Sequence, residues 1–212
     1  MVQALIGEDF SMKTLLAALA LTLATGSGAL AFDADTQGII DQQKRGKLVA
    51  IADVAHLMGS SEQWCYDNQE HSCAWSEVYL DVTDGGVSFE LSNAWDEETD
   101  YAFTDEGAFS GNKVCQTGVN WVTNLRGIRR SDGTSIGGRD LHELKLAIGE
   151  SRPDLEAYDD CFDYLYVSSD PERDTVTLQQ RQYADGVHEP LNDVDVTVYF
   201  NAEAAAGLTL RL

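Results

Sequence analysis

The stretch Val78-Tyr79-Leu80-Asp81-Val82-Thr83-Asp84-Gly85-Gly86-Val87-Ser88-Phe89-Glu90-Leu91 decides the fold class of this 212-residue chain. Val78, Leu80 and Val82 alternate with more polar neighbours, and a second alternating run follows the turn residues Asp84-Gly85-Gly86. An Asp-Gly turn between two alternating runs is a strong signal for a β-hairpin. Strands with one apolar and one polar face are typical of antiparallel sheets, so this stretch predicts such a sheet.

The same alternation continues along the rest of the chain. Turn residues separate the runs, among them Gly107, Ser110-Gly111-Asn112 and Asp170-Pro171-Glu172-Arg173. The further strands that this pattern predicts are residues 101–104, 113–121, 162–167, 175–181 and 194–200.

Two segments have the apolar spacing of a helix. Residues 33–57 begin with capping residues, but Gly46 interrupts them, so two short helices, or a helix and a strand, fit as well as one long helix. Residues 140–149 begin with a capping-box pattern and gather apolar side chains on one helical face. We expect a helix there, although residues 144–148 also alternate as a strand would.

Together these patterns predict one α+β domain over residues 32–212. Its expected architecture is an antiparallel β-sheet or half-open barrel with an N-terminal helical segment, one short helix and two disulfides. No repeat, low-complexity linker or shift in composition indicates a second domain. A chain of this length buries enough surface for a hydrophobic core without a metal.

Residues 12–31 have the layout of a secretory signal peptide. Lys13 precedes an apolar run rich in leucine and alanine, and Gly26-Ser27-Gly28 interrupts that run. Ala29-Leu30-Ala31 then offers small residues to a signal peptidase, which predicts cleavage between Ala31 and Phe32. We therefore expect a periplasmic or secreted protein.

The first eleven residues do not fit the start of a signal peptide, because they carry two acidic side chains. We expect translation to begin at Met12 and residues 1–31 to be absent from the mature protein. The apolar run is shorter than the roughly 20 residues of a membrane span, so no membrane insertion is expected after cleavage.

The charge of the chain is strongly negative: 36 acidic residues against 14 basic ones give a formal net charge of −22 at pH 7. This balance argues against binding to nucleic acid, whose phosphates attract a surplus of lysine and arginine. It also argues against docking on anionic lipid. A solvated acidic surface explains the composition most simply, and binding of cations or of a basic partner is the alternative.

The four cysteines are even in number and all follow the predicted cleavage site. In an oxidising compartment this predicts two disulfides. Of three possible connectivities we expect Cys65–Cys73, which closes a small loop, and Cys115–Cys161, which joins two distant strands. Metal binding by Cys65 with His71 and Cys73 is the rival interpretation.

One segment concentrates positive charge on this acidic chain. Arg126, Arg129, Arg130 and Arg139 surround a glycine-containing stretch, and arginine is suited to carboxylates and phosphates. They are the candidate ligand-binding residues, for an anionic small ligand or an envelope protein. The alternative is that these arginines pair with nearby acids.

The motifs of the common catalytic classes are missing from the sequence. No nucleophile elbow is found after the signal peptide, His142-Glu143 has no second histidine at zincin spacing, and the four histidines show no ligand spacing. No metal or cofactor is therefore predicted, and no catalytic residue can be named. The expected function is an exported binding or interaction domain, with a carboxylate-dependent hydrolase and an envelope-associated structural module as alternatives.

Overall fold

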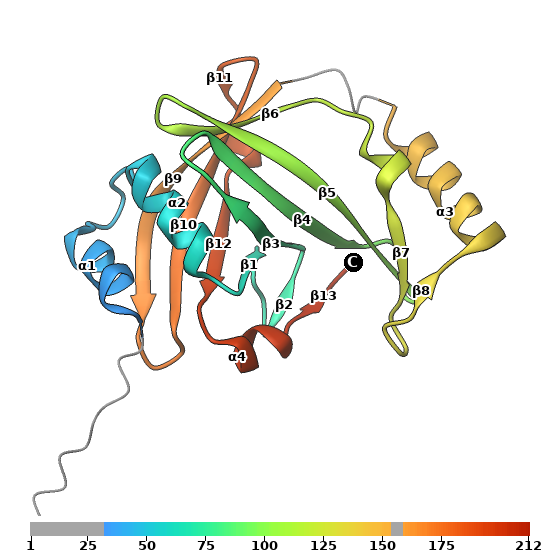
Figure 1. Cartoon of the computed structure of the whole chain (residues 1–212), viewed down its shortest axis with the longest axis horizontal. Coiled ribbons are helices and arrows are strands. Elements are labelled where there is room, and N and C mark those ends of the chain that lie inside the picture. Colours follow the sequence, from blue (N-terminus) through green and yellow to red (C-terminus); the bar gives the residue numbers. More distant parts are fainter. Residues whose placement is uncertain (1–31, 154–158) are drawn as a thin grey trace, which may run out of the picture.

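The computed structural model describes residues 32–153 and 159–212. The predicted signal peptide, residues 12–31, lies outside these ranges. Four α-helices occur in the described part of the chain (Figure 1). They are α1 (Ala34–Gln42), α2 (Ile51–Ser60), α3 (Gly138–Ser151) and α4 (Ala202–Ala206).

Most of the remaining residues form strands. The strands are β1 (Gln63–Tyr66), β2 (Ser72–Cys73), β3 (Trp75–Val82), β4 (Gly86–Ala94), β5 (Thr99–Ser110), β6 (Lys113–Thr117), β7 (Arg126–Arg129), β8 (Ser135–Ile136), β9 (Asp159–Asp170), β10 (Thr175–Ala184), β11 (Val187–His188), β12 (Val194–Tyr199) and β13 (Thr209–Leu210). Two 3-10 helices, η1 (Trp121–Asn124) and η2 (Pro190–Asn192), complete the fold.

Eleven strands form one large antiparallel sheet, which confirms the predicted α+β class. The strand order is β4-β3-β1-β12-β10-β9-β6-β5-β7-β8, with β11 paired to β10 and a further pairing of β4 with β5. The sheet is strongly curled but half-open, because the short strand β6 bridges β5 and β9 at one end only. Beyond Thr117, where β6 ends, the part with β7 and α3 separates from β9 and β10 (Figure 1).

The N-terminal helices fill the end of the curled sheet that lies away from this opening. Asp33 caps α1 by accepting hydrogen bonds from the backbone N–H groups of Asp35 and Thr36 at 2.9 and 3.0 Å. Gly46, with φ of 74°, then turns the chain, so the predicted helical segment is two short helices. Residues of α2 pack into the main core on the concave face, together with side chains of β1, β9, β10 and β12.

The segment predicted as a helix at residues 140–149 is α3, which spans Gly138–Ser151. Its buried residues Leu144 and Ile148 pack with η1 and β5 in a second core. Gly127 of β7 permits this contact, since a Cβ at that position would lie 2.7 Å from Leu144 Cδ2. The second core therefore joins α3 to the extended arm of β5, beside the opening of the sheet.

The hairpin predicted for residues 78–91 is formed by β3 and β4, but Val78 and Leu80 of β3 lie on the outer face of the sheet. Val78 and Leu80 are 37% and 58% exposed, whereas Glu77 and Tyr79 point into the concave interior. A register irregularity between Tyr79 and Asp81 then brings Val82 back to the interior. Tyr79 faces inward in place of these aliphatic residues because its larger ring packs edge-to-face against the core residue Trp64.

Two predicted strand boundaries are wrong. Gly107 does not separate strands: β5 runs through it, and its missing side chain makes room for Val114, whose Cγ1 would lie 2.6 Å from a Cβ. The strand predicted for residues 113–121 ends at Thr117, and Trp121 begins η1 instead.

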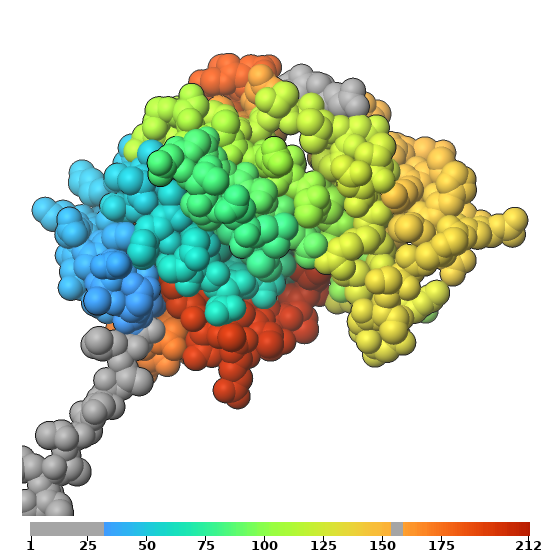
Figure 2. All heavy atoms as spheres, viewed as in Figure 1, coloured from blue at the N-terminus to red at the C-terminus, as the bar shows by residue number. Residues whose placement is uncertain are grey.

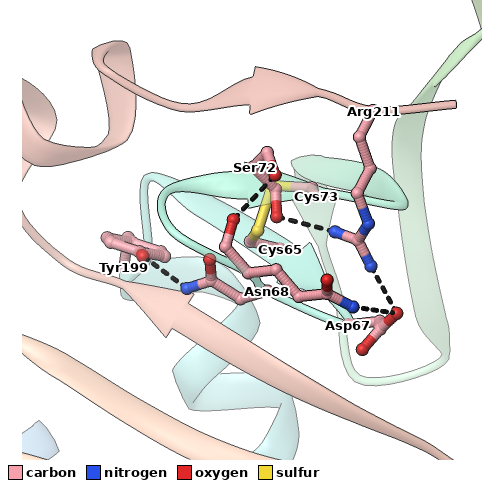
Figure 3. The surroundings of a disulfide bond; sticks show 8 residues. Cys65, Asp67, Asn68, Ser72, Cys73, Tyr199 and Arg211 are labelled. Atoms are coloured by element: carbon pink, nitrogen blue, oxygen red, sulfur yellow. Dashed lines mark hydrogen bonds and ion pairs between the residues drawn. A yellow bond between two sulfur atoms is a disulfide. The ribbon is translucent and has the colours of Figure 1, made fainter.

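Both predicted disulfides are present, Cys65–Cys73 and Cys115–Cys161. The first lies on the outer face of the sheet, where the C-terminal strand β13 pairs with β2 (Figure 3). Arg211 fixes this segment by donating to the carbonyl oxygen of Ser72 at 2.8 Å and to the carboxylate of Asp67. The second disulfide joins directly paired residues of β6 and β9.

Within the described ranges, no helix combines the length and the apolar character needed to cross a membrane.

Candidate functional site

A cleft of about 670 Å³ occupies the concave side of the sheet, at the end away from α2. In the space-filling view, a separate indentation lies between the part of the molecule with β7, β8 and α3 and the C-terminal segment, whose residues do not line the cleft (Figure 2). The inner wall of the cleft comes from β3, β4 and β5, and the other wall from β9 and β10. The lining residues are Trp75, Phe89, Leu91, Asn93, Tyr101, Phe103, Asp105, Gln116, Thr117, Gly118, Val119, Trp121, Arg152, Asp160, Gln182, Ala184, Glu189 and Asn192.

Aromatic rings form the wall on the side of β5. Tyr101 and Phe103 are two residues apart on one strand, so both side chains face the interior. Trp121 of η1 stacks on Phe103 with ring centroids 4.0 Å apart, and on Tyr101 at 5.8 Å. These rings belong to the second core, which holds them in place. Across the cleft mouth, Trp75 stacks on the buried Tyr66 at 4.8 Å.

Two carboxylates face the cleft from opposite walls. Asp105 is the next inward residue of β5 after Phe103, and burial raises the pKa of its carboxyl group. Asp160 of β9 accepts a hydrogen bond from Gln182 Nε2 on the neighbouring strand at 2.9 Å. The cleft therefore combines aromatic rings with polar and charged side chains, which make up half of its lining residues.

A buried polar cluster lies beside Trp75 and Phe89. Glu77 Oε2 accepts hydrogen bonds from the Tyr66 and Tyr79 hydroxyls at 2.7 and 2.9 Å. Gln180 Nε2 donates to the hydroxyls of Tyr66 and Tyr164 at 3.3 and 3.1 Å. Burial raises the pKa of Glu77 to about 7, against the stabilising effect of the two tyrosine hydrogen bonds.

The position of Glu77 decides what chemistry the cluster can perform. Its carboxyl group has the raised pKa of a general acid or base, but Glu77 is 6% exposed and does not line the cleft. Trp75 and Phe89 line the cleft beside this cluster, packing against Tyr66 and Tyr79 respectively. Of these two rings, Trp75 is half-buried and Phe89 is buried, so a molecule in the cleft would reach Trp75 before Phe89 and would not reach Glu77.

A second hollow, of about 920 Å³, adjoins the cleft and shares Asp105, Thr117, Val119 and Trp121 with it. It extends over the outer faces of β4 and β5, where the lining is made mostly of small and polar side chains such as Ser88 and Thr104. The aromatic cleft is the better candidate site, because most of the large rings lie there.

The predicted arginine segment does not gather its four side chains at one point. Arg126 pairs with Glu90 of β4 through two hydrogen bonds, and Arg129 Nη2 lies 3.3 Å from Asp140 Oδ2 of α3. Since side chains alternate along β7, these partners lie on opposite faces of the strand.

The two remaining arginines also have partners. Arg130 donates to the carbonyl oxygens of Asp96 and Leu210, and its Nε lies 3.4 Å from Asp100 Oδ1. Arg139 lies 3.9 Å from Glu143 on the exposed side of α3. Each arginine thus has an acidic partner, as the alternative interpretation expected, and anion binding by this segment stays a prediction.

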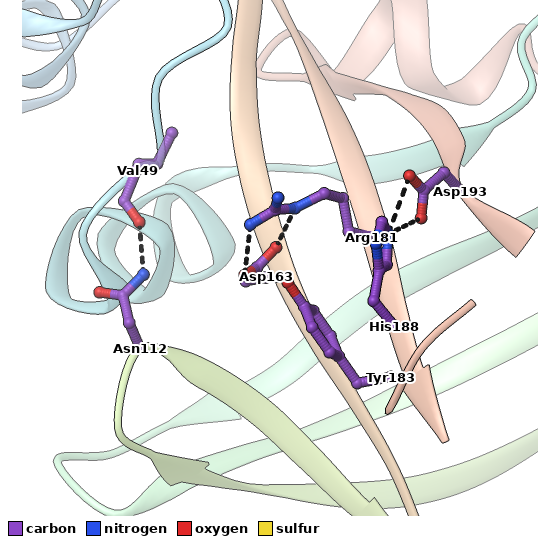
Figure 4. A network of polar contacts seen from close by, with 7 residues as sticks. All are labelled: Val49, Asn112, Asp163, Arg181, Tyr183, His188 and Asp193. Carbon is purple, nitrogen blue, oxygen red and sulfur yellow. Dashed lines mark hydrogen bonds and ion pairs between the residues drawn. The ribbon is translucent and has the colours of Figure 1, made fainter. Parts of the chain in front are cut away.

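Another polar network lies on the outer face of β9 and β10 (Figure 4). Arg181 donates two hydrogen bonds of 2.7 Å to the buried carboxylate of Asp163, which also accepts one from Tyr183. His188 contacts Asp193 at 2.9 Å nearby. Each charge in this network is satisfied within the protein, so the network serves to hold the strands together. Within the described ranges, no group of three or more metal-ligating side chains is close enough to hold a metal ion.

The residues of the cleft were not selected from the sequence. Asp105 lies just outside the strand predicted for residues 101–104. A signal was nevertheless present: Tyr101, Phe103 and Asp105 alternate with exposed residues, which places an acid on the apolar face of a strand.

Comparison with known proteins adds no assignment. No protein-family model, no curated protein and no solved structure matches this chain.

Proposed function

We propose that this protein is an exported binding domain that holds a small, partly apolar molecule in the aromatic cleft. The observation that carries the proposal is the cleft itself, whose lining includes five aromatic side chains, Asp105 and Asp160. Its volume of about 670 Å³ falls in the usual range of small-molecule sites. Most of the aromatic lining lies on strands of one hydrogen-bonded sheet, which holds these side chains in place.

Export is supported by the two disulfides, since such bonds form and persist in oxidising compartments. The negative charge of the chain favours a soluble, monomeric state through repulsion between copies. A carboxylate-dependent hydrolase stays the alternative: Asp105 and Asp160 line the cleft and the pKa of Asp105 is raised, although the buried Glu77 lies outside the lining. The envelope-associated structural module differs in the size of its partner, and it would leave the cleft empty.

The test is a variant that fills the cleft without removing any internal contact. Ala184 of β10 lines the cleft, and Ala184→Trp would place an indole in that space. Ala108→Trp is the matched control, because Ala108 is an exposed alanine of β5 that lines the outer hollow instead.

A thermal-shift screen of small aromatic compounds would be run on the wild type and both variants. Compounds that bind the cleft raise the melting temperature of the wild type and of Ala108→Trp, and have no effect on Ala184→Trp. Compounds that raise the melting temperature of the wild type and of Ala184→Trp, but not of Ala108→Trp, would place the site in the outer hollow. If no compound stabilises the wild type, the small-molecule proposal is contradicted and the structural-module hypothesis gains support.

A further inference from the structure

Asp105 differs in its partners from other buried or half-buried acids that form ion pairs. Glu90 pairs with Arg126, and Asp163 pairs with Arg181. Asp105, in contrast, has one hydrogen bond, from the backbone N–H of Glu106 at 2.8 Å, and no basic partner in the described part of the chain. A carboxylate that is partly removed from water without a counter-ion is unfavourable, as the raised pKa of Asp105 indicates.

The surroundings of Asp105 make the inner part of the cleft more negative. Glu77 lies close enough for the charge of Asp105 to contribute to its raised pKa. On the opposite wall, Asp160 has an uncharged partner, Gln182. Glu189 adds a further acid to the lining. A positive group at this position would thus be attracted by several carboxylates at once.

The basic residue of the cleft lies elsewhere. Arg152 lines the cleft from the end of α3 and is exposed; burial raises the pKa of Tyr101, and the charge of Arg152 offsets part of this effect. The inner wall by contrast carries Asp105 beside the rings of Phe89 and Phe103. Aromatic faces attract cations as well as apolar groups. The cleft therefore has an acidic, aromatic inner part and a basic outer end.

We propose that the cleft selects a small organic cation, an ammonium or guanidinium group attached to an apolar body, with the charged group placed against Asp105. This inference rests on the proposed function and adds the chemical class of the ligand. The net charge of −22 supports it, because a negative protein attracts cations over long distances and repels anions.

Three probes that share a phenethyl group test the charge preference: phenethylammonium, phenethyl alcohol and hydrocinnamate. Each has one phenyl ring and a two-carbon linker, and the terminal group is positive, neutral or negative. Calorimetric titration of the wild type at neutral pH should give at least about tenfold tighter binding for phenethylammonium than for phenethyl alcohol, and the weakest binding for hydrocinnamate.

Two variants then locate the preference. Asp105→Asn removes the charge with little change in shape, and we expect it to abolish the tenfold preference for the ammonium while binding of the alcohol stays within about twofold. Glu106→Gln is the matched control: it removes one negative charge from the next residue, which points outward. We expect it to leave the preference intact, which would separate a contact at Asp105 from attraction by the overall charge.

Failure of this inference can be distinguished from failure of the proposed function. Tighter binding of hydrocinnamate or of the alcohol, lost in Ala184→Trp, would overturn the cation preference and leave a small-molecule cleft. An unchanged preference in Asp105→Asn would overturn the assignment of Asp105. If none of the three probes binds the wild type, the cation inference is wrong, and the compound screen with Ala184→Trp decides separately whether the cleft binds other molecules.

Discussion

Glu77 is a carboxyl group that folding buries on the concave side of the sheet. Its ordinary pKa of 4.5 rises to about 7, because burial disfavours the charged form more than two tyrosine hydroxyls stabilise it. A group whose pKa rises on folding binds its proton more tightly in the folded state. It therefore lowers the free energy of unfolding as the pH increases from about 4.5 to about 7, and the full loss remains at higher pH.

This effect can be isolated by Glu77→Gln, which keeps an acceptor oxygen for the tyrosine hydroxyls but cannot ionise. We expect the stability of the variant relative to the wild type to increase by roughly 3 kcal/mol between acidic and mildly alkaline pH. Urea unfolding of both proteins across this pH range measures the difference in stability. The other titrating groups are the same in both proteins, so their effects cancel in this difference. Glu106→Gln, at an exposed carboxylate, should show no such trend. A difference that does not change with pH would mean that Glu77 ionises as easily in the folded protein as in the unfolded chain.

At the scale of the elements, the β4–β5 ladder depends on one close contact between backbones. Gly86 of β4 lies opposite Ala108 of β5. A Cβ on Gly86 would lie 2.2 Å from the carbonyl oxygen of Gly107 and 3.1 Å from Ala108 Cα. Since both neighbours are backbone atoms of a paired strand, they cannot move without breaking the ladder.

Gly86→Ala should therefore lower the free energy of unfolding by at least about 2 kcal/mol, as overpacking does when the structure cannot relax. The adjacent Gly85→Ala is the matched control, because its Cβ would meet nothing nearer than Thr83 Oγ1 at 3.9 Å. We expect this control to change stability by less than about 0.5 kcal/mol, the usual range for surface substitutions. Chemical denaturation of the two variants tests the pair, and equal effects would contradict the close contact.

The same hairpin indicates how far local patterns can be read from the sequence. The turn at Asp84-Gly85-Gly86 and the existence of two strands followed from short-range signals, as did the helix at α3. The buried face of β3 did not follow, because Glu77 and Tyr79 are stabilised by Tyr66 and Trp64 of another strand. The periodicity of apolar residues along one strand cannot predict contacts with residues of another strand.

At the scale of the whole molecule, the sequence predicted the class of the fold but not the order of the strands. β1 pairs with β12, so the two ends of the domain lie side by side in the sheet. The cleft arises from this topology, since it combines residues of β3, β5, η1, β9 and β10. Arg126 and Arg130 stood out in the sequence because basic residues are rare in it, whereas their acidic partners Glu90 and Asp100 were not identifiable before the strands were placed.

The two disulfides constrain this topology unequally. Cys65–Cys73 closes a loop of 8 residues, whereas Cys115–Cys161 closes one of 46 that contains β7, β8 and α3. The loss of chain entropy in the unfolded state grows with loop length and corresponds to about 2.5 and about 4 kcal/mol. We therefore expect Cys115→Ser with Cys161→Ser to reduce the free energy of unfolding more than Cys65→Ser with Cys73→Ser. Urea unfolding of both double variants provides the measurement. Cys115→Ser with Cys161→Ser should also weaken ligand binding, because these substitutions release the junction of β6 and β9 beside Asp160. A larger loss of stability from Cys65→Ser with Cys73→Ser would contradict this account.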